Sequence, residues 1–356
     1  MALPPLYGHE GIRHRLAGAI ASGRLPQALL FEGPRGVGKQ RLALWLAQAL
    51  LCEGGAKRPP SGEGCGVCQA CRRVLDLAHP DVHWFVPVEL AKRGADADQQ
   101  VDLVAEALAE ELAARRGGRG YEPATGLASH GIASVRLLLR QLALTPALAA
   151  RKVFIIGDAE RLVPQPGADA AANALLKALE EPPANTVFVL TAAEPEALLP
   201  TLLSRVVRVR LARLADSIVA AFAQRELGVK GQRELAQRVA AADGCIGRLL
   251  ADTTGRARGT AAAERFREAV GAGPVGRYAF ALAQQPFQAR GAFTDMLDGL
   301  LAQLREEARA GRDTGRVVDA IAQVLEARGW AQGNVNPQLV AAVLGEELGE
   351  EGGTPA

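Results

Sequence analysis

Eight consecutive residues have the types and the spacing of a phosphate-binding loop. Gly33-Pro34-Arg35-Gly36-Val37-Gly38-Lys39-Gln40 follows an apolar run and precedes a segment with helical periodicity. Glycines let backbone N–H groups approach phosphate oxygens, the start of a helix adds positive potential, and the lysine reaches the outer phosphates. The segment predicts a nucleotide site made by Gly33, Arg35, Gly36, Val37, Gly38, Lys39 and Gln40. The alternative is a glycine-rich turn that binds no nucleotide.

The groups that hydrolysis would need are incomplete. A Ser or Thr hydroxyl normally follows the lysine and ligates Mg²⁺, whereas Gln40 offers a longer amide. A pair of adjacent acids should end the next core strand, and Gly157-Asp158-Ala159-Glu160 lacks the first of them. Asp158 and Glu160 are either remnants of such a site or ordinary acids at a helix start, stabilised by the helix dipole. The sequence leaves open whether ATP and Mg²⁺ bind.

Four cysteines form a second group of residues whose type and spacing could bind a metal. Cys52, Cys65, Cys68 and Cys71 are separated by twelve, two and two residues. Thiolates three residues apart can bind one ion from a tight turn, and Cys52 can complete a tetrahedron. The spacing predicts a structural Zn²⁺, because four protein ligands leave no open position for a catalytic water. The alternative is a set of buried thiols without metal, and Cys245 stands alone as an expected core residue.

Alternating strands and helices are expected to position these groups. Apolar runs at 28–31, 152–156 and 186–190 predict buried strands, and 11–22 and 41–51 have helical periodicity. Helix-forming segments between the strands predict an α/β fold with a parallel sheet and crossover helices. From Ala215 onward strand signals vanish, which leaves helical segments with expected breaks near Gly244, Gly255, 271–274 and 329–333.

Composition limits the class of protein. The 356 residues are 49% apolar and 22% charged, as in a globular protein with two or three domains. The net charge of +2 provides no general field for binding nucleic acid. Because no segment has the roughly 20 apolar residues of a membrane span and the N-terminus does not have a leader pattern, we expect a cytoplasmic protein without membrane contact. Clustered thiols in that reducing compartment favour metal binding over disulfides.

Taken together, these segments resemble the bacterial clamp-loader family of AAA+ proteins over roughly residues 5–255. The most specific segment is Ala172-Asn173-Ala174-Leu175-Leu176-Lys177-Ala178-Leu179-Glu180-Glu181-Pro182-Pro183, and the cysteines resemble the family's zinc module. Leu203-Ser204-Arg205 resembles the family's Ser-Arg-Cys motif, with Val206 in place of Cys. The resemblance implies that Arg205 is an arginine finger for the ATP site of a neighbouring subunit. Arg205 could instead be a surface cation at the start of a strand.

Departures from the family pattern indicate which kind of member this is. The resemblance to the ATP-hydrolysing gamma/tau subunit predicts an acid at 157, a polar sensor near 192 and an arginine at 247. The sequence has Gly157, Ala192 and Gly247, with Arg248 one residue late, which turns a helical side chain by about 100°. Together with Gln40, these changes indicate a stator that does not hydrolyse ATP by itself. An ATP-hydrolysing gamma/tau-like motor and a AAA+ adaptor outside replication are the alternatives.

The resemblance also implies a domain plan and partners. We expect a AAA+ domain over 1–213, with the zinc module at 52–71 and an insertion at 88–131, then a small helical lid over 214–256. A helical collar for oligomerisation is expected over 257–345, followed by a disordered tail over 346–356. The insertion is outside the family pattern and is expected to be a surface segment, part helix and part mobile loop. The implied partners in a hetero-oligomer are the clamp-loader delta and gamma/tau subunits, with the sliding clamp and primed DNA reached through the complex.

Overall fold

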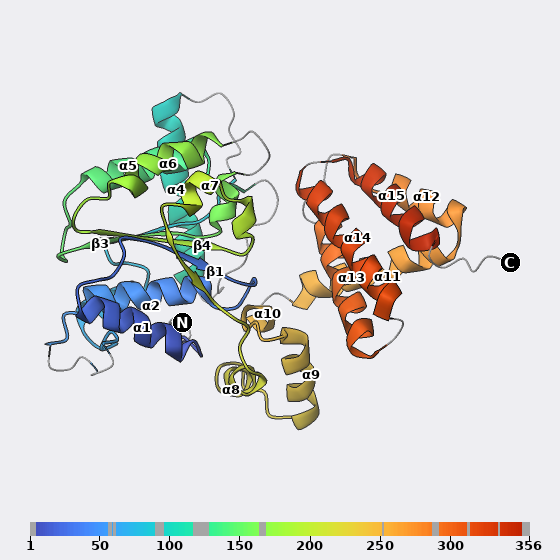
Figure 1. Ribbon diagram of the computed structural model, residues 1–356, viewed down its shortest axis with the longest axis horizontal. Coiled ribbons are helices and arrows are strands. Elements are labelled where there is room, and N and C mark those ends of the chain that lie inside the picture. Colours follow the sequence, from blue (N-terminus) through green and yellow to red (C-terminus); the bar gives the residue numbers. More distant parts are fainter. Residues whose placement is uncertain are drawn as a thin grey trace. The chain divides into compact units, whose positions relative to one another are not determined.

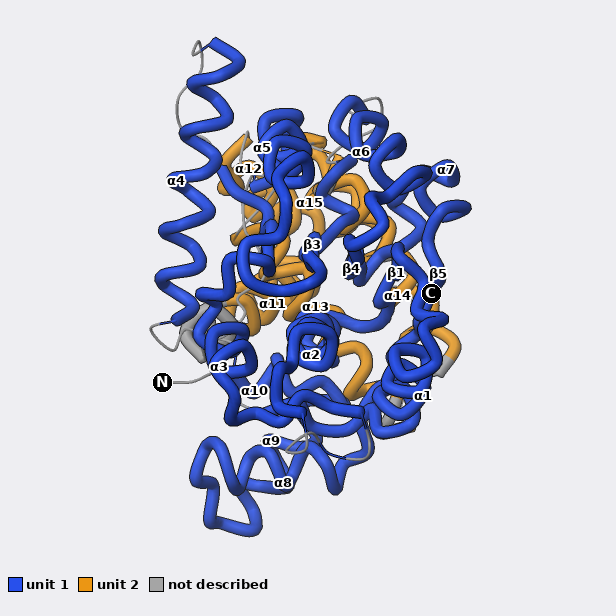
Figure 2. Tube along the Cα trace, turned by 90° about the vertical axis from the view of Figure 1, so that its left-hand side faces the viewer, with its two compact units in different colours: residues 1–124, 128–250 blue, residues 125–127, 251–356 orange. Residues whose placement is uncertain are grey.

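The chain divides into two compact units, residues 1–124 with 128–250 and residues 125–127 with 251–356 (Figure 2). None of the described helices is both long enough and apolar enough to cross a membrane. The computed structural model describes residues 5–55, 59, 62–89, 96–116, 128–163, 169–250, 253–286, 292–311, 314–333 and 335–350.

A five-stranded sheet forms the centre of the first unit (Figure 1). The strand order is β2-β3-β4-β1-β5, and every pairing is parallel. The predicted strands at 28–31, 152–156 and 186–190 are confirmed, but the apolar pattern does not predict the two edge strands. The strands are β1 (Ala28–Glu32), β2 (Val82–Phe85), β3 (Lys152–Ile156), β4 (Thr186–Ala192) and β5 (Val207–Arg210).

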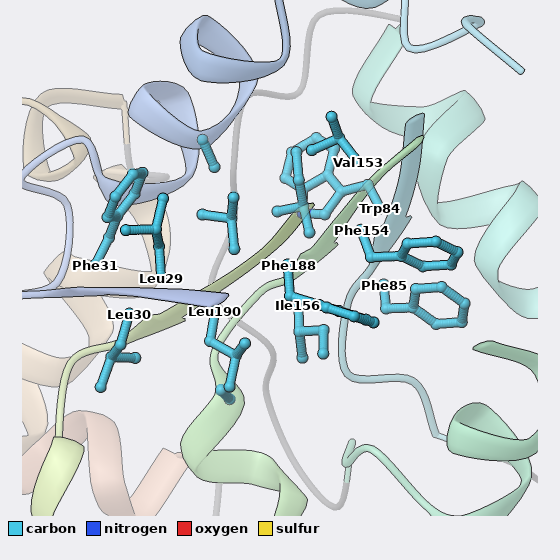
Figure 3. Packing of buried hydrophobic residues seen from close by; sticks show 14 of the residues in the cluster. Leu29, Leu30, Phe31, Trp84, Phe85, Val153, Phe154, Ile156, Phe188 and Leu190 are labelled. Carbon is cyan, nitrogen blue, oxygen red and sulfur yellow. The ribbon is translucent and has the colours of Figure 1, made fainter. Parts of the chain in front are cut away.

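Apolar side chains pack on both faces of the central strands (Figure 3). Every residue of β3 and β4 is buried. The rings of Phe154 and Phe188 stack with their centroids 5.4 Å apart, and Phe31 on β1 is fully buried in the same apolar cluster. Crossover helices cover both faces of a parallel sheet, which explains why these strands are continuous apolar runs in the sequence.

Helices cover the two faces of this sheet (Figure 1). One face carries α1 (Glu10–Ala21) and α2 (Lys39–Leu51), so the predicted helices at 11–22 and 41–51 are confirmed. The other face carries α5 (Ile132–Ala143) and α6 (Ala170–Glu180). The remaining helices of the first unit are α3 (Gln69–Leu75), α4 (Ala97–Arg116), α7 (Pro200–Leu203), α8 (Asp216–Leu227), α9 (Gln232–Ala242) and α10 (Gly247–Leu250), with 3₁₀ turns at Ala159–Leu162 and Pro195–Ala197.

The predicted insertion at 88–131 contributes to the core. Its helix α4 buries Val101, Val104 and Leu108 in the main apolar cluster, so this part of the insertion is more than a surface segment. The ends of the insertion are joined by backbone hydrogen bonds between Val88 and Ser129 in both directions. The predicted mobile loop falls on 90–95 and 117–127, which lie outside the described residues.

The second unit is helical. Its helices are α11 (Thr253–Gly271), α12 (Pro274–Leu282), α13 (Ala292–Arg309), α14 (Thr314–Gln332) and α15 (Pro337–Glu350). The buried residues that hold them together include Phe266, Phe293, Leu297, Leu300 and Val324.

The predicted breaks of the helical region are confirmed. Helices end at Ala242, Gly271 and Gln332, which places breaks near Gly244, at 271–274 and within 329–333, and α11 begins at Thr253, close to Gly255. Gly255 and Gly329 themselves lie inside helices, because a glycine costs a helix interior only about 1 kcal/mol, which the burial of an apolar stripe offsets. Two predicted bounds need correction. Helix α15 continues to Glu350, so 346–350 are helical and only 351–356 lie outside the described residues. The predicted boundary at 256/257 falls inside α11, while the compact units divide after Leu250.

Candidate functional site

The predicted phosphate loop connects β1 to α2. Gly33, Gly36 and Gly38 have φ angles of 149°, 80° and 109°, a region that favours glycine. A Cβ at Gly33 would also lie 2.4 Å from the carbonyl oxygen of Leu211, so only glycine fits there. Val37 is buried in the core, whereas Arg35 is exposed and forms an ion pair with Glu194 at 3.6 Å.

Lys39 is bound to its own loop. Its side chain is 6% exposed, and Nζ donates hydrogen bonds to the carbonyl oxygens of Gly33 at 2.7 Å and Pro34 at 2.9 Å. Burial lowers the pKa of Lys39 from its ordinary value, while the nearby carboxylate of Glu160 acts in the opposite direction. In a loop that holds nucleotide this ammonium contacts the outer phosphates. Here two of its three N–H donors are used by the loop backbone.

Two other segments contact the tip of the loop. The N–H of Gly247, at the start of α10, donates to the carbonyl oxygen of Gly36 at 2.8 Å. A Cβ at Gly247 would lie 2.5 Å from the Cα of Gly36, so the two backbones touch. From the N-terminal side, Nε2 of His9 donates to the carbonyl oxygen of Val37 at 2.9 Å. The loop is therefore closed from both sides by residues of the same chain.

Gln40 and Gly157 pack against each other where a metal site would be needed. The Gln40 side chain is 5% exposed, and neither its Nε2 nor its Oε1 has a hydrogen-bond partner among the described residues. A Cβ at Gly157 would lie 2.6 Å from Nε2 of Gln40, so any side chain at 157 must displace this amide. Mg²⁺ prefers hydroxyl and carboxylate oxygens, and positions 40 and 157 supply neither. These residues do not fit a magnesium site.

The two acids after β3 have different surroundings. Asp158 adopts a left-handed conformation with φ 48°, and its N–H donates to Oγ1 of Thr191 at 3.1 Å. Glu160 is buried in the following 3₁₀ turn, and its Oε1 accepts the N–H of Ala193 at 3.2 Å. Burial, followed by the charge of Asp158, raises the pKa of Glu160. Glu160 is thus not an ordinary solvated acid at a helix start.

The two predicted sensor positions carry no group for a phosphate. Ala192, at the end of β4, is fully buried and apolar. Gly247 contacts the loop through its backbone, as described above. Arg248 donates to Oδ2 of Asp243 at 3.1 Å, and Arg213 binds the same carboxylate oxygen. Arg248 is thus engaged with an acid that lies between α9 and α10.

Arg205 lies just after α7, near the edge strand β5. Its side chain is 31% exposed. The Nη1 group donates to the carbonyl oxygen of Thr201 at 2.7 Å and to Oγ of Ser204 at 3.2 Å, and Nε donates to Oε1 of Glu180 at 2.7 Å. An arginine that is partly exposed and held by its own chain has a defined position at the surface.

The four predicted cysteine ligands are brought together. The Sγ atoms of Cys52, Cys65, Cys68 and Cys71 all lie within 4.8 Å of one another, an arrangement that could hold one metal ion. Backbone N–H groups donate to the sulfurs, as from Cys68 to Cys65 at 3.3 Å. Hydrogen bonds from the N–H groups of Val67 and Cys68 lower the pKa of Cys65 to about 6, whereas burial raises the pKa of Cys71. Cys245 is fully buried in the core, as expected.

The sequence pattern does not reveal several contacts at these sites. His9 and the backbone of Gly247 both close the phosphate loop, and nothing in their spacing signals this role. Glu180 binds Arg205 and lies within the segment 172–183 that the sequence marks as distinctive. The sequence of that segment could have marked Glu180 as a functional residue, although it does not predict the contact with Arg205.

Comparison with known proteins places the chain in a family. A family model described as "DNA polymerase III, delta subunit" matches residues 8–215, more than half of the chain. The chain belongs to this family. The match covers both edge strands, the phosphate loop, the cysteine cluster and Arg205, whereas Gly247 and Arg248 lie beyond the part of the chain that matches the DNA polymerase III delta-subunit family.

Relatives of this delta-subunit family member carry two kinds of name. The DNA polymerase III subunit delta′ of Bacillus subtilis is 34% identical over 191 residues, which are 53% of this chain and 43% of that protein. The delta′ subunit of Pseudomonas aeruginosa is 34% identical over 181 residues, 51% of this chain and 42% of that protein. The gamma/tau subunit of Mycobacterium tuberculosis strain H37Rv is 33% identical over 199 residues, 56% of this chain and 26% of that protein. The chain thus spans less than half the length of these relatives.

Among solved structures, a gamma-subunit-related DNA polymerase III protein from Thermotoga maritima is similar over 96% of this chain and 99% of that chain. The sequence identity is 16% and the TM-score is 0.43. Membership of the delta-subunit family follows from the sequence matches alone.

Proposed function

We propose that this chain is a delta′-type clamp-loader subunit of bacterial DNA polymerase III. It helps to load the sliding clamp on primed DNA, does not hydrolyse ATP by itself, and supplies Arg205 to the ATP site of a neighbouring subunit. The contact between Gln40 and Gly157 carries this proposal. Gln40 and Gly157 place a buried amide and a glycine where a hydroxyl and a carboxylate would bind Mg²⁺.

The same observation favours the delta′ type over the gamma/tau alternative. A motor subunit needs its loop lysine and a metal for phosphoryl transfer. In this chain Lys39 is bound by two loop carbonyls, and a buried amide and a glycine stand where a hydroxyl and a carboxylate would bind the metal. Family membership alone does not separate the two types, because delta′ and gamma/tau relatives are similarly identical to the chain.

Further parts of the proposal concern the metal and the assembly. The cysteine cluster holds a structural Zn²⁺, for which four thiolates in a tetrahedron are a common ligand set. The helices α8 to α10 act as the lid, and the helices α11 to α15 of the second unit act as the collar. The chain works in the cytoplasm within a hetero-oligomer that contains the delta and gamma/tau subunits. ATP and Mg²⁺ belong to the neighbouring sites.

An Arg205→Ala variant incorporated into the reconstituted loader tests the arginine finger. Such a finger is worth about 10³-fold or more at its own site. We therefore expect ATP turnover at one site to be almost abolished while the other sites continue, and clamp loading to fall. Arg208→Ala is the matched control, because Arg208 is also a partly exposed arginine and pairs with Glu32 on β1. Unchanged ATPase activity in the Arg205→Ala loader, with normal assembly, contradicts the finger.

Two measurements separate the alternative functions. Turnover of ATP by the purified chain that is abolished by Lys39→Ala would support a gamma/tau-like motor. Co-purification with the delta and gamma/tau subunits supports a loader component. Failure to bind either subunit would favour an adaptor outside replication.

A further inference from the structure

The guanidinium of Arg205 is held by partners on two sides. On one side, Nε and Nη2 both donate to the same oxygen, Oε1 of Glu180, with an Nε···Oε1 distance of 2.7 Å. On the other side, Nη1 donates to Thr201 at 2.7 Å and Ser204 at 3.2 Å. A guanidinium has five N–H groups in a rigid plane. Among the described residues, these contacts leave one N–H, on Nη2, for a further acceptor.

The carboxylate that holds Arg205 is itself well positioned. Glu180 is the last residue of α6, next to Leu179, which is buried in the main core. The chain that follows is tied to the sheet, because the amide of Gln27 donates to the carbonyl oxygen of Pro183 at 3.0 Å. Gln27 immediately precedes β1. The end of α6 therefore has a fixed place relative to the central strands.

The ion pair by itself is too weak to be a structural necessity. Both side chains are partly exposed, Arg205 by 31% and Glu180 by 44%. Pairs of this kind contribute little to stability, because water screens the charges and two long side chains must be ordered. The contact can nevertheless select one orientation of the guanidinium, because two N–H groups converge on one oxygen atom. Orientation is what an arginine needs in order to reach a phosphate across an interface.

We propose that Glu180 is a positioning residue for Arg205. This inference rests on the proposed role of Arg205 as an arginine finger. Oε1 of Glu180 fixes the plane of the guanidinium and leaves the free N–H of Nη2 available for an oxygen of the neighbouring nucleotide. Glu180 itself does not contact the nucleotide. The inference gives a chemical role to one residue of the distinctive segment 172–183.

The contact geometry dictates the choice of variants. Because both N–H groups use one oxygen of Glu180, a glutamine retains the acceptor that matters, whereas an alanine removes it. Glu180→Ala and Glu180→Gln therefore separate positioning from simple charge pairing. Glu181→Ala is the matched control, since it removes the same charge from the adjacent exposed residue. Arg205→Ala, alone and combined with Glu180→Ala, sets the size of the full effect.

The test measures ATP hydrolysis by the reconstituted loader, with kcat and KM determined separately. We expect Glu180→Ala to lower kcat by more than about half of the loss caused by Arg205→Ala, with KM unchanged, because a finger acts in the transition state. Glu180→Gln should retain most of the activity, and Glu181→Ala all of it. Adding Glu180→Ala to Arg205→Ala should cause no further loss, because the two residues act as a unit. Assembly and thermal unfolding of all variants should match those of the parent.

The outcomes distinguish this inference from the proposed function. If Arg205→Ala has no effect on turnover, the finger itself is wrong. If Arg205→Ala lowers kcat but Glu180→Ala does not, only the role of Glu180 is overturned. An increase of kcat in Glu180→Ala, or equal losses in the Ala and Gln variants, would also overturn positioning through Oε1.

Discussion

At the scale of single residues, Gln40 and Gly157 depend on each other for space. The amide of Gln40 occupies space that a side chain at 157 would need, and it gains no hydrogen bond there among the described residues. A buried amide without partners is unfavourable, and this one fits only because residue 157 has no side chain. The two residues should therefore be energetically coupled.

Gly157→Val tests this coupling. The new side chain must displace the Gln40 amide, so we expect a loss of about 2 kcal/mol in the free energy of unfolding. In a Gln40→Ala background the same change should cost less than about 1 kcal/mol, because the space is free. Urea unfolding of the four proteins in the cycle measures both values. Additive effects of the two substitutions would show that the contact does not matter.

His83 on β2 provides a second prediction, which concerns pH. Its ring stacks on Phe154 with the centroids 4.6 Å apart. Burial, followed by the charge of Lys152, lowers the pKa of His83 to about 4. The unfolded chain binds this proton near pH 6.5, so it binds more protons than the folded chain between these values. The stability contributed by neutral His83 is complete above pH 6.5 and is lost as the pH falls toward 4.

A His83→Phe variant should therefore lose less stability on acidification. Between pH 7.5 and pH 5.5 we expect its decrease to be smaller than that of the parent by about 1 kcal/mol, measured by urea unfolding at both pH values. His79 and His130 also have pKa values lowered by burial and will keep part of the slope in both proteins. The same pH dependence in parent and variant would contradict the assignment.

At the scale of elements, the cysteine cluster links two helices. Cys52 caps the end of α2, and Cys68 precedes α3, which carries Cys71. With Zn–S bonds of about 2.3 Å, sulfurs at the corners of a tetrahedron are about 3.8 Å apart, which is compatible with four sulfurs that lie within 4.8 Å of one another. A metal bound here would fix the chain between the two helices, which contains few apolar residues of its own.

We expect one zinc ion per chain, measured by metal analysis of the purified protein. Cys65→Ser should lose most of the metal and lower the thermal midpoint by several degrees, because the site contributes directly to folding. Cys245→Ala is the matched control, since this cysteine is buried away from the cluster. The control should retain the metal whatever its effect on stability. Full zinc content in Cys65→Ser would exclude this residue as a ligand.

The elements differ in how far the sequence could predict them. Strands β3 and β4 are buried on both faces and stand out as apolar runs. Strand β5 alternates Val207, Arg208, Val209 and Arg210, a strand signal that is too short to be distinctive. The spacing of glycines and cysteines predicts where the loop and the metal cluster lie. It could not predict the contact of Gly36 with Gly247, because tertiary packing alone brings these distant segments together.

At the scale of the whole molecule, the closed phosphate loop determines how the chain responds to nucleotide. Lys39 binds two loop carbonyls, Gly247 binds Gly36, and His9 binds Val37. Nucleotide entry would have to break at least the lysine contacts and desolvate phosphates without a fitting metal site. Helix α10, which begins at Gly247, is thereby joined to the loop. If the proposed function holds, the chain should keep one conformation while ATP binds to and leaves the neighbouring subunits.

We therefore expect the isolated chain not to bind ATP. Because a ligand that binds the folded state raises its stability by RT ln(1 + [L]/Kd), we expect 1 mM ATP with Mg²⁺ to shift the thermal midpoint by less than about 1 °C. Gly247→Ala should separate α10 from the loop, because its Cβ would lie 2.5 Å from the Cα of Gly36. Faster amide hydrogen exchange at 36–38 would report that separation. Gly11→Ala is the control, since a Cβ there meets nothing within 4 Å. A shift of several degrees in the parent protein would mean that the loop opens for nucleotide, and that the contacts of Lys39 and Gly247 are not what keeps it closed.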